Sequence, residues 1–144
     1  MSEQLYDTDY YAWIQRQTEL ARQRRLGELD LDNLLEELED MGKSRQRTLE
    51  SRLEILFMHL LKWQLQPENR SNSWKASIIE QRRKLGKLLK ENPSLGYKLP
   101  DILHDVYEDA RIAASRETDL PLDTFPEGMP FTYERAVSHD FWPQ

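Results

Sequence analysis

The sequence contains no cysteine, few glycines and no long apolar run. Without cysteine there is no disulfide framework, no thiolate metal site and no cysteine nucleophile. The 5 glycines are scattered, so none forms a phosphate-cradling loop, and there is no Gly-x-Ser-x-Gly nucleophile elbow. No apolar stretch approaches the roughly 18 residues of a membrane span, and the first residues do not resemble a signal peptide. We therefore expect a cytoplasmic protein with no membrane partner.

Residues that favour β-sheets are also scarce. Valine and isoleucine together occur 8 times, against 22 leucines, and no convincing alternation of apolar and polar residues is present. Leucine loses little side-chain freedom in a helix, whereas β-branched residues favour strands. The composition predicts an all-α fold, and 144 residues are enough for a single helical domain, 1–144, with its own core.

Apolar periodicity and capping residues predict an up-and-down bundle of about four main helices in residues 1–118. The expected helices cover residues 8–25, 31–66, 72–92 and 100–118. Residues 119–144 hold 4 of the 7 prolines, which excludes most regular structure there. We expect this Pro-rich C-terminal segment to contain one short helix, about 133–139, and to pack across the bundle through its apolar side chains.

The second expected helix is long for a compact protein of this size. Residues 31–66 would span about 54 Å, against a compact diameter of about 38 Å. Gly42 and Ser44 lie in its middle, where a break costs least. The sequence therefore favours a short arm, 31–41, followed by a main helix, 44–66, and a Gly42→Ala variant that is less stable.

Histidines and carboxylates do not form a metal-binding pattern. His59 has no acidic residue at i−3 or i−4, and His104, with Asp101 and Glu108 nearby, lacks a second such pair elsewhere. A di-metal carboxylate site in a helical bundle needs two pairs of this kind. We expect no metal, no cofactor and no catalytic residue.

Charge is distributed unevenly along the chain. Residues 28–40 contain seven acidic residues and no basic one, whereas residues 68–90 carry a net charge of +5. One interpretation is local neutralisation between the two segments. The other is a basic face on the third helix, including Arg82, Arg83 and Lys87, that meets an acidic or phosphate-bearing partner.

A second candidate surface surrounds the turn before that helix. In the segment 59–74, His59, Trp63, Arg70 and Trp74 are expected around a hairpin. Arginine stacks on indole rings, and histidine can form a hydrogen bond across the turn. The alternative is a well-packed corner of the bundle, because aromatic residues at helical spacing are usually core residues.

Three strings resemble a known bacterial family. They are LDLDNLLEELEDMGKS (29–44), LESRLEILFMHLLKWQLQP (49–67) and RSNSWKASIIEQRRKL (70–85), and both ends of the chain are similar as well. The family is known as domain of unknown function twenty-nine. The resemblance implies a small all-α bacterial protein and no activity, substrate or cofactor. Its recurring motif corresponds here to Glu36, Glu37, Gly42, Ser44, Arg52, His59, Trp63, Arg70, Ser71 and Trp74. Met129 stands where members often have cysteine, so no thiol role is available there.

These observations favour a non-catalytic interaction or regulatory protein that binds another protein or a second copy of itself. The alternative is a weak nucleic-acid binder that uses the basic third helix, residues 70–90. An enzyme of unrecognised activity ranks third. The net charge of −6 argues weakly against a nucleic-acid binder that uses its whole surface.

Overall fold

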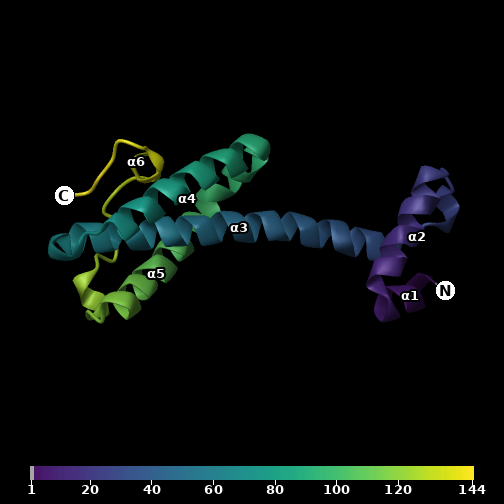
Figure 1. Cartoon of the computed structure of the whole chain (residues 1–144), viewed down its shortest axis with the longest axis horizontal. Coiled ribbons are helices and arrows are strands. Elements are labelled where there is room, and N and C mark those ends of the chain that lie inside the picture. The colour runs from purple at the N-terminus through teal and green to yellow at the C-terminus, as the bar shows by residue number, and fades with distance from the viewer. Residues whose placement is uncertain (1) are drawn as a thin grey trace. The chain divides into compact units, whose positions relative to one another are not determined.

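The computed structural model describes the backbone of residues 2–144 and the side chains of residues 5–144. Within this range the fold is all-α, as predicted, with no strand (Figure 1). The helices are α1 (Ser2–Thr8), α2 (Tyr10–Arg22), α3 (Leu31–Leu65), α4 (Asn72–Glu91), α5 (Leu99–Thr118) and α6 (Tyr133–Val137). Short 3-10 turns lie between them at Leu26–Glu28, Pro67–Asn69, Pro93–Lys98 and Leu122–Thr124. None of the described helices is long and apolar enough to cross a membrane.

The chain forms two compact units, one that ends at Arg45 and one that covers Gln46–Gln144. In the first unit, α1 and α2 lie against the first turns of α3. Asp9 caps α2, because its side chain accepts a hydrogen bond from the backbone N–H of Ala12. The helix expected over residues 8–25 therefore corresponds to α2, and α1, which was not predicted from the sequence, precedes it. The α2 helix ends at Arg22, and Arg24 follows in the left-handed conformation at φ 60°.

One aromatic anchor fastens α2 to the start of α3. Trp13 is buried, and its Nε1 donates a hydrogen bond to Oδ2 of Asp30 at 3.0 Å. The backbone N–H of Asp30 donates in turn to Oε1 of Gln17 at 2.8 Å. Burial alone raises the pKa of Asp30, but hydrogen bonds from Asn33 and Trp13 outweigh it, so the net pKa is lowered.

The expected break at Gly42 is wrong, because α3 is a continuous helix of 35 residues. Gly42 has no positive φ, and a Cβ added there would meet nothing within 4 Å. An interior glycine costs about 1 kcal/mol relative to alanine, whereas a break leaves several backbone groups without intrahelical partners. The prediction compared the helix length with a single compact unit, but α3 extends from the first unit into the second.

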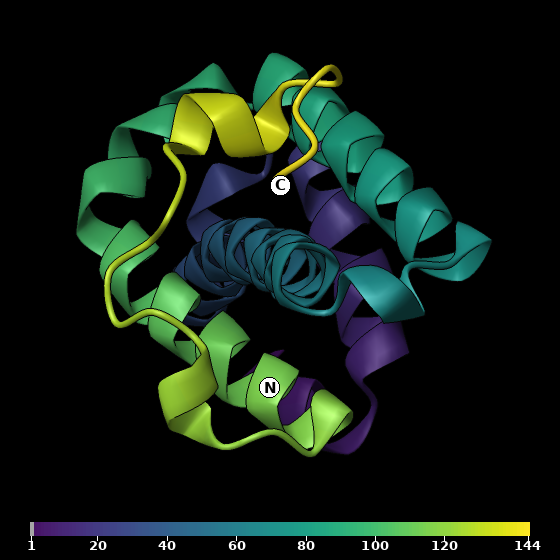
Figure 2. The same ribbon diagram turned by 90° about the vertical axis from the view of Figure 1, so that its left-hand side faces the viewer.

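In the second unit, α3, α4 and α5 alternate in direction, as expected for an up-and-down bundle (Figure 1). Seen along α3, the helices α4 and α5 flank it on two sides, and the C-terminal segment covers a third (Figure 2). The core of this unit consists of buried side chains from all four parts. They include Leu49, Leu53, Leu56, Phe57, Leu60 and Leu61 of α3, Ile78 and Leu85 of α4, Val106, Ala110 and Ala114 of α5, and Phe125, Phe131 and Ala136.

Polar side chains of the bundle hold the C-terminal segment by its backbone. Arg82 on α4 donates to the carbonyl oxygens of Ala136 and Phe141, at 2.8 and 2.7 Å. Arg111 on α5 donates to the carbonyl oxygen of Phe125 at 2.9 Å. The segment therefore packs across the bundle as predicted, and it does so through backbone carbonyls as well as through apolar side chains.

Candidate interaction surfaces

Two of the residues predicted around the hairpin do meet there. Arg70 donates from Nε to the carbonyl oxygen of Trp63 at 2.8 Å, and its guanidinium carbon lies 4.9 Å from the centre of the Trp63 ring. The Trp63 ring also packs on Trp142, with ring centres 4.8 Å apart. Arg70 reaches the carbonyl oxygen of Pro143 as well, at 3.3 Å. This cluster connects the turn between α3 and α4 to the end of the chain.

Trp74 interacts with a different cation. The Nζ of Lys62 lies 4.8 Å from the centre of the Trp74 ring and 3.1 Å from Oε1 of Glu117 on α5. Lys62 is buried, whereas the Glu117 side chain is about half exposed. A buried ammonium needs a partner of opposite charge or a π face, and Lys62 has both. No local pattern predicts this pairing, because Glu117 is distant along the chain.

His59 does not form a hydrogen bond across the hairpin. Its Nδ1 lies 2.9 Å from the carbonyl oxygen of Ile55, one turn earlier on the same helix. Burial of the partly buried ring lowers the pKa of His59, and the nearby Lys62 ammonium lowers it further. The imidazole is therefore mostly neutral at pH 7, with Nδ1–H as the donor to Ile55.

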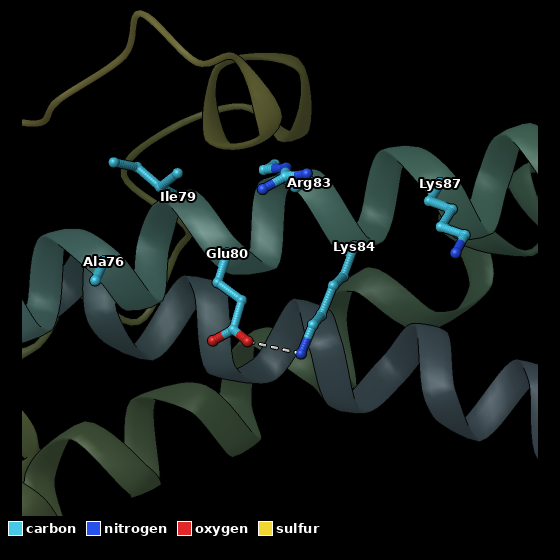
Figure 3. A pocket seen from close by; sticks show the side chains of 6 residues that line it. All are labelled: Ala76, Ile79, Glu80, Arg83, Lys84 and Lys87. Carbon is cyan, nitrogen blue, oxygen red and sulfur yellow. Dashed lines mark ion pairs between the residues drawn. The ribbon is translucent and has the colours of Figure 1, made fainter.

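The three basic residues predicted as one face of α4 divide into two groups. Arg82 is only 2% exposed, and its guanidinium lies 5.3 Å from the Trp142 ring. Arg83 and Lys87 are exposed, and they line an open hollow of about 580 Å³ (Figure 3). Arg82 is therefore part of the packing between α4 and the C-terminal segment, and Arg83 and Lys87 face outward.

The hollow on α4 is basic with a small apolar floor. Its other lining residues are Ala76, Ile79, Glu80 and Lys84. Glu80 and Lys84 form an ion pair at 2.7 Å, drawn as the dashed line in Figure 3. Among the side chains that the structure describes, no ion-pair partner is seen for Arg83 or Lys87. A neighbouring hollow of about 290 Å³ adds Arg52 of α3 to Lys84 and Lys87. We call these five side chains, Arg52, Ile79, Arg83, Lys84 and Lys87, the basic face.

The first unit has an apolar groove that the sequence did not reveal. Its volume is about 420 Å³, and it lies between α2 and α3. The apolar part of its lining is formed by Tyr10, Trp13, Ile14, Ala21, Leu29, Leu34, Leu38 and Met41. Gln17, Thr18 and Glu37 are the polar residues of the wall. We call this the N-terminal groove.

A row of exposed leucines continues the N-terminal groove around α3. Leu31, Leu35 and Leu38 are 59%, 56% and 60% exposed, although they repeat at helical spacing like core residues. Farther along the same helix, Leu49, Leu53 and Leu56 continue this apolar row and are fully buried. We call Leu31, Leu35 and Leu38 the leucine stripe. Periodicity predicted that these leucines share a face, but it did not show that this face is uncovered.

Acidic side chains border the leucine stripe. Asp32 and Glu39 stand at i−3 and i+4 from Leu35, so they are its neighbours on the helix surface. On the groove side of the stripe, Glu37 accepts a hydrogen bond from the hydroxyl of Tyr6 at 2.6 Å. Hydrogen bonds from Tyr6 and Tyr10 lower the pKa of Glu37. The surface around the stripe is therefore negatively charged at neutral pH.

The described side chains do not form a recognisable metal centre. Within residues 5–144, no group of three or more His, Asp or Glu side chains is close enough to hold a metal ion. The hollows described above are open, and neither the N-terminal groove nor the basic face includes a histidine. What these surfaces offer chemically is apolar contact, charge and hydrogen bonding.

Comparison with known proteins identifies one family. The model of the family described as Domain of unknown function DUF29 matches residues 5–142, nearly the whole chain. No curated protein and no solved structure matches the chain.

Proposed function

Since the chain belongs to the family described as Domain of unknown function DUF29, whose description states no activity, we propose a function from the chain's own surfaces. The protein is a non-catalytic interaction protein that binds another macromolecule. The binding surface is the leucine stripe together with the N-terminal groove.

The main support for this proposal is that large apolar side chains are exposed close together in the first unit. Tyr10, Tyr11, Ile14, Leu26, Leu31, Leu35, Leu38 and Met41 are exposed there. Contiguous apolar surface of this kind, bordered by polar residues, is typical of sites where proteins bind one another. Single exposed apolar residues are common and need no explanation. Six of these eight, however, lie together: Tyr10, Ile14, Leu38 and Met41 line the groove, and Leu31 and Leu35 adjoin it in the stripe.

Two groups suited to acid–base chemistry, His59 and Lys62, are engaged in structural contacts. The Nδ1 of His59 bonds to its own helix, and Lys62 is paired with Glu117. These contacts support an interaction role over a catalytic one, because a general acid or base must be free to reach a substrate atom.

Affinity capture with matched baits tests the proposal. The baits are the tagged full-length chain, a Leu35→Ser/Leu38→Ser variant, and an Ile112→Ser control that changes an exposed apolar residue on α5. Each is incubated with a lysate of the source organism, and the captured proteins are identified by mass spectrometry. We expect proteins that the wild-type chain and the control retain and the leucine variant loses. Equal capture by all three baits would contradict the proposal.

A second candidate function rests on the basic face. Arg52, Arg83, Lys84 and Lys87 gather from two helices onto one open surface, which is the electrostatic footprint of a phosphate-bearing partner. Fluorescence anisotropy with labelled DNA and RNA over a salt series tests it. Nucleic-acid binding predicts an affinity that falls steeply with salt and is lost in Arg83→Ala/Lys87→Ala. Equal binding by the wild-type chain and by Arg83→Ala/Lys87→Ala would exclude this face.

A further inference from the structure

We propose that the occupant of the leucine stripe and N-terminal groove is an amphipathic helix of a partner protein, with basic residues along one edge of its apolar face. This inference rests on the proposed function and gives its partner a stated chemistry. Two features of the first unit support it: the geometry of the apolar surface and the charge beside it.

The geometry matches a helix better than a small ligand. Leu31, Leu35 and Leu38 follow one another at steps of four and three residues, which is the spacing of a coiled-coil seam. Leu38 also lines the N-terminal groove, so the stripe and the groove form one continuous apolar surface. Grooves of this kind accept the apolar face of a helix through residues at i, i+3, i+4 and i+7.

Charge determines which kind of helix fits. Asp32 and Glu39 border the leucine stripe, and residues 28–40 contain seven acids and no base. A partner helix lying on the stripe places one edge of its apolar face beside these carboxylates. Lysine or arginine at that edge is attracted, whereas glutamate is repelled. A second copy of the same segment would bring carboxylates against carboxylates, so a basic partner is favoured over symmetrical self-pairing.

Two synthetic peptides of three heptads test the proposal. Both carry leucines at the a and d positions, and they differ only in the flanking residues, lysine in one and glutamate in the other. Binding of each labelled peptide to the full-length chain is measured by fluorescence anisotropy. We expect the lysine peptide to bind about tenfold more tightly at low salt, with a difference that shrinks as salt rises.

Variants of the chain locate the binding surface. Leu35→Ser/Leu38→Ser is expected to lose the lysine peptide, and Ile112→Ser to keep it. Asp32→Lys/Glu39→Lys is expected to reverse the preference toward the glutamate peptide. Circular dichroism of each variant checks that its helices are intact. Equal affinity for the two peptides, or no binding of either, would overturn the inference.

Analytical ultracentrifugation of the chain without peptide tests the other possible occupant, a second copy of the chain. A concentration-dependent dimer that Leu35→Ser/Leu38→Ser abolishes would mean that a second copy covers the stripe, and the inference would be wrong. The proposed function fails separately. If lysate capture depends on the leucines but the peptides do not discriminate by charge, the interaction function stands and the basic helix is excluded.

Discussion

The Nε of Arg82, on α4, donates a hydrogen bond to the carbonyl oxygen of Ala136, on α6, at 2.8 Å. The same guanidinium donates to the carbonyl oxygen of Phe141 and lies 5.3 Å from the Trp142 ring. One buried arginine thus fastens two points of the C-terminal segment to the bundle. Its neighbour in sequence, Arg83, is exposed on the basic face, so the two arginines make a matched pair for experiment.

Arg82→Met is expected to destabilise the protein by about 2–4 kcal/mol, because two carbonyl acceptors lose a buried donor that methionine cannot replace. Arg83→Met is expected to change the free energy of unfolding by less than about 0.5 kcal/mol. Chemical denaturation of both variants measures the difference. Similar losses in the two would show that Arg82 does not hold the C-terminal segment.

Gly42→Ala is expected to stabilise the protein by up to about 1 kcal/mol, because the residue is helical and a methyl group meets nothing there. This is opposite to the expectation from the sequence. Gly86→Ala, in the middle of α4 and equally unobstructed, is the control. A higher melting temperature for the Gly86 variant and a lower one for the Gly42 variant would mean that α3 is interrupted.

Leu35→Ala and Leu53→Ala provide a second matched pair, on one helix. Leu53 is fully buried in the second unit, and its truncation is expected to cost about 2–5 kcal/mol. Leu35 is exposed, and its truncation is expected to stay within about 0.5 kcal/mol. Thermal unfolding of each variant measures both. A large loss at Leu35 would place it in a core and would remove the leucine stripe as a binding surface.

His59 makes stability depend on pH in a definite direction. Burial lowers the pKa of His59 below its ordinary value of 6.5 in the folded chain. As the pH falls below that ordinary value, the unfolded chain takes up a proton before the folded chain does, so this contribution to stability is lost. His59→Asn removes the titration and keeps an amide donor near Ile55. The free energy of unfolding is expected to fall less between about pH 7 and pH 5 in the variant than in the wild type. An equal or steeper fall in the variant would contradict the burial of His59.

The sequence predicted the ends of α4 and the start of α6 well because their signals are local. Ser71 caps α4, its side chain accepting from the backbone N–H of Trp74, and Pro93 follows the end of that helix. Thr132 likewise caps α6. Such caps act over three residues, so they can be read directly from the sequence.

Contacts between distant segments had no local signal. Trp63 and Arg70 were expected to meet, and they do, but the partner ring is Trp142 at the other end of the chain. The burial of Arg82 likewise depends on a segment more than fifty residues later. The leucine stripe was missed for a related reason: periodicity shows which side chains share a face, but not whether another element covers that face.

The two halves of α3 have the same backbone hydrogen bonds but different surroundings. Leu53 and Leu56 belong to the core of the second unit, so their amide protons are expected to exchange with solvent only when that core opens. Leu35 and Leu38 belong to the smaller first unit, so fewer contacts protect their amide protons. The free energy of local opening increases with the number of contacts that must be broken. Native-state hydrogen exchange along this single helix is therefore expected to slow sharply past Arg45. The protection of each part of α3 against exchange therefore depends on the elements packed against it. A partner bound to the leucine stripe would slow exchange in the first half of α3 alone.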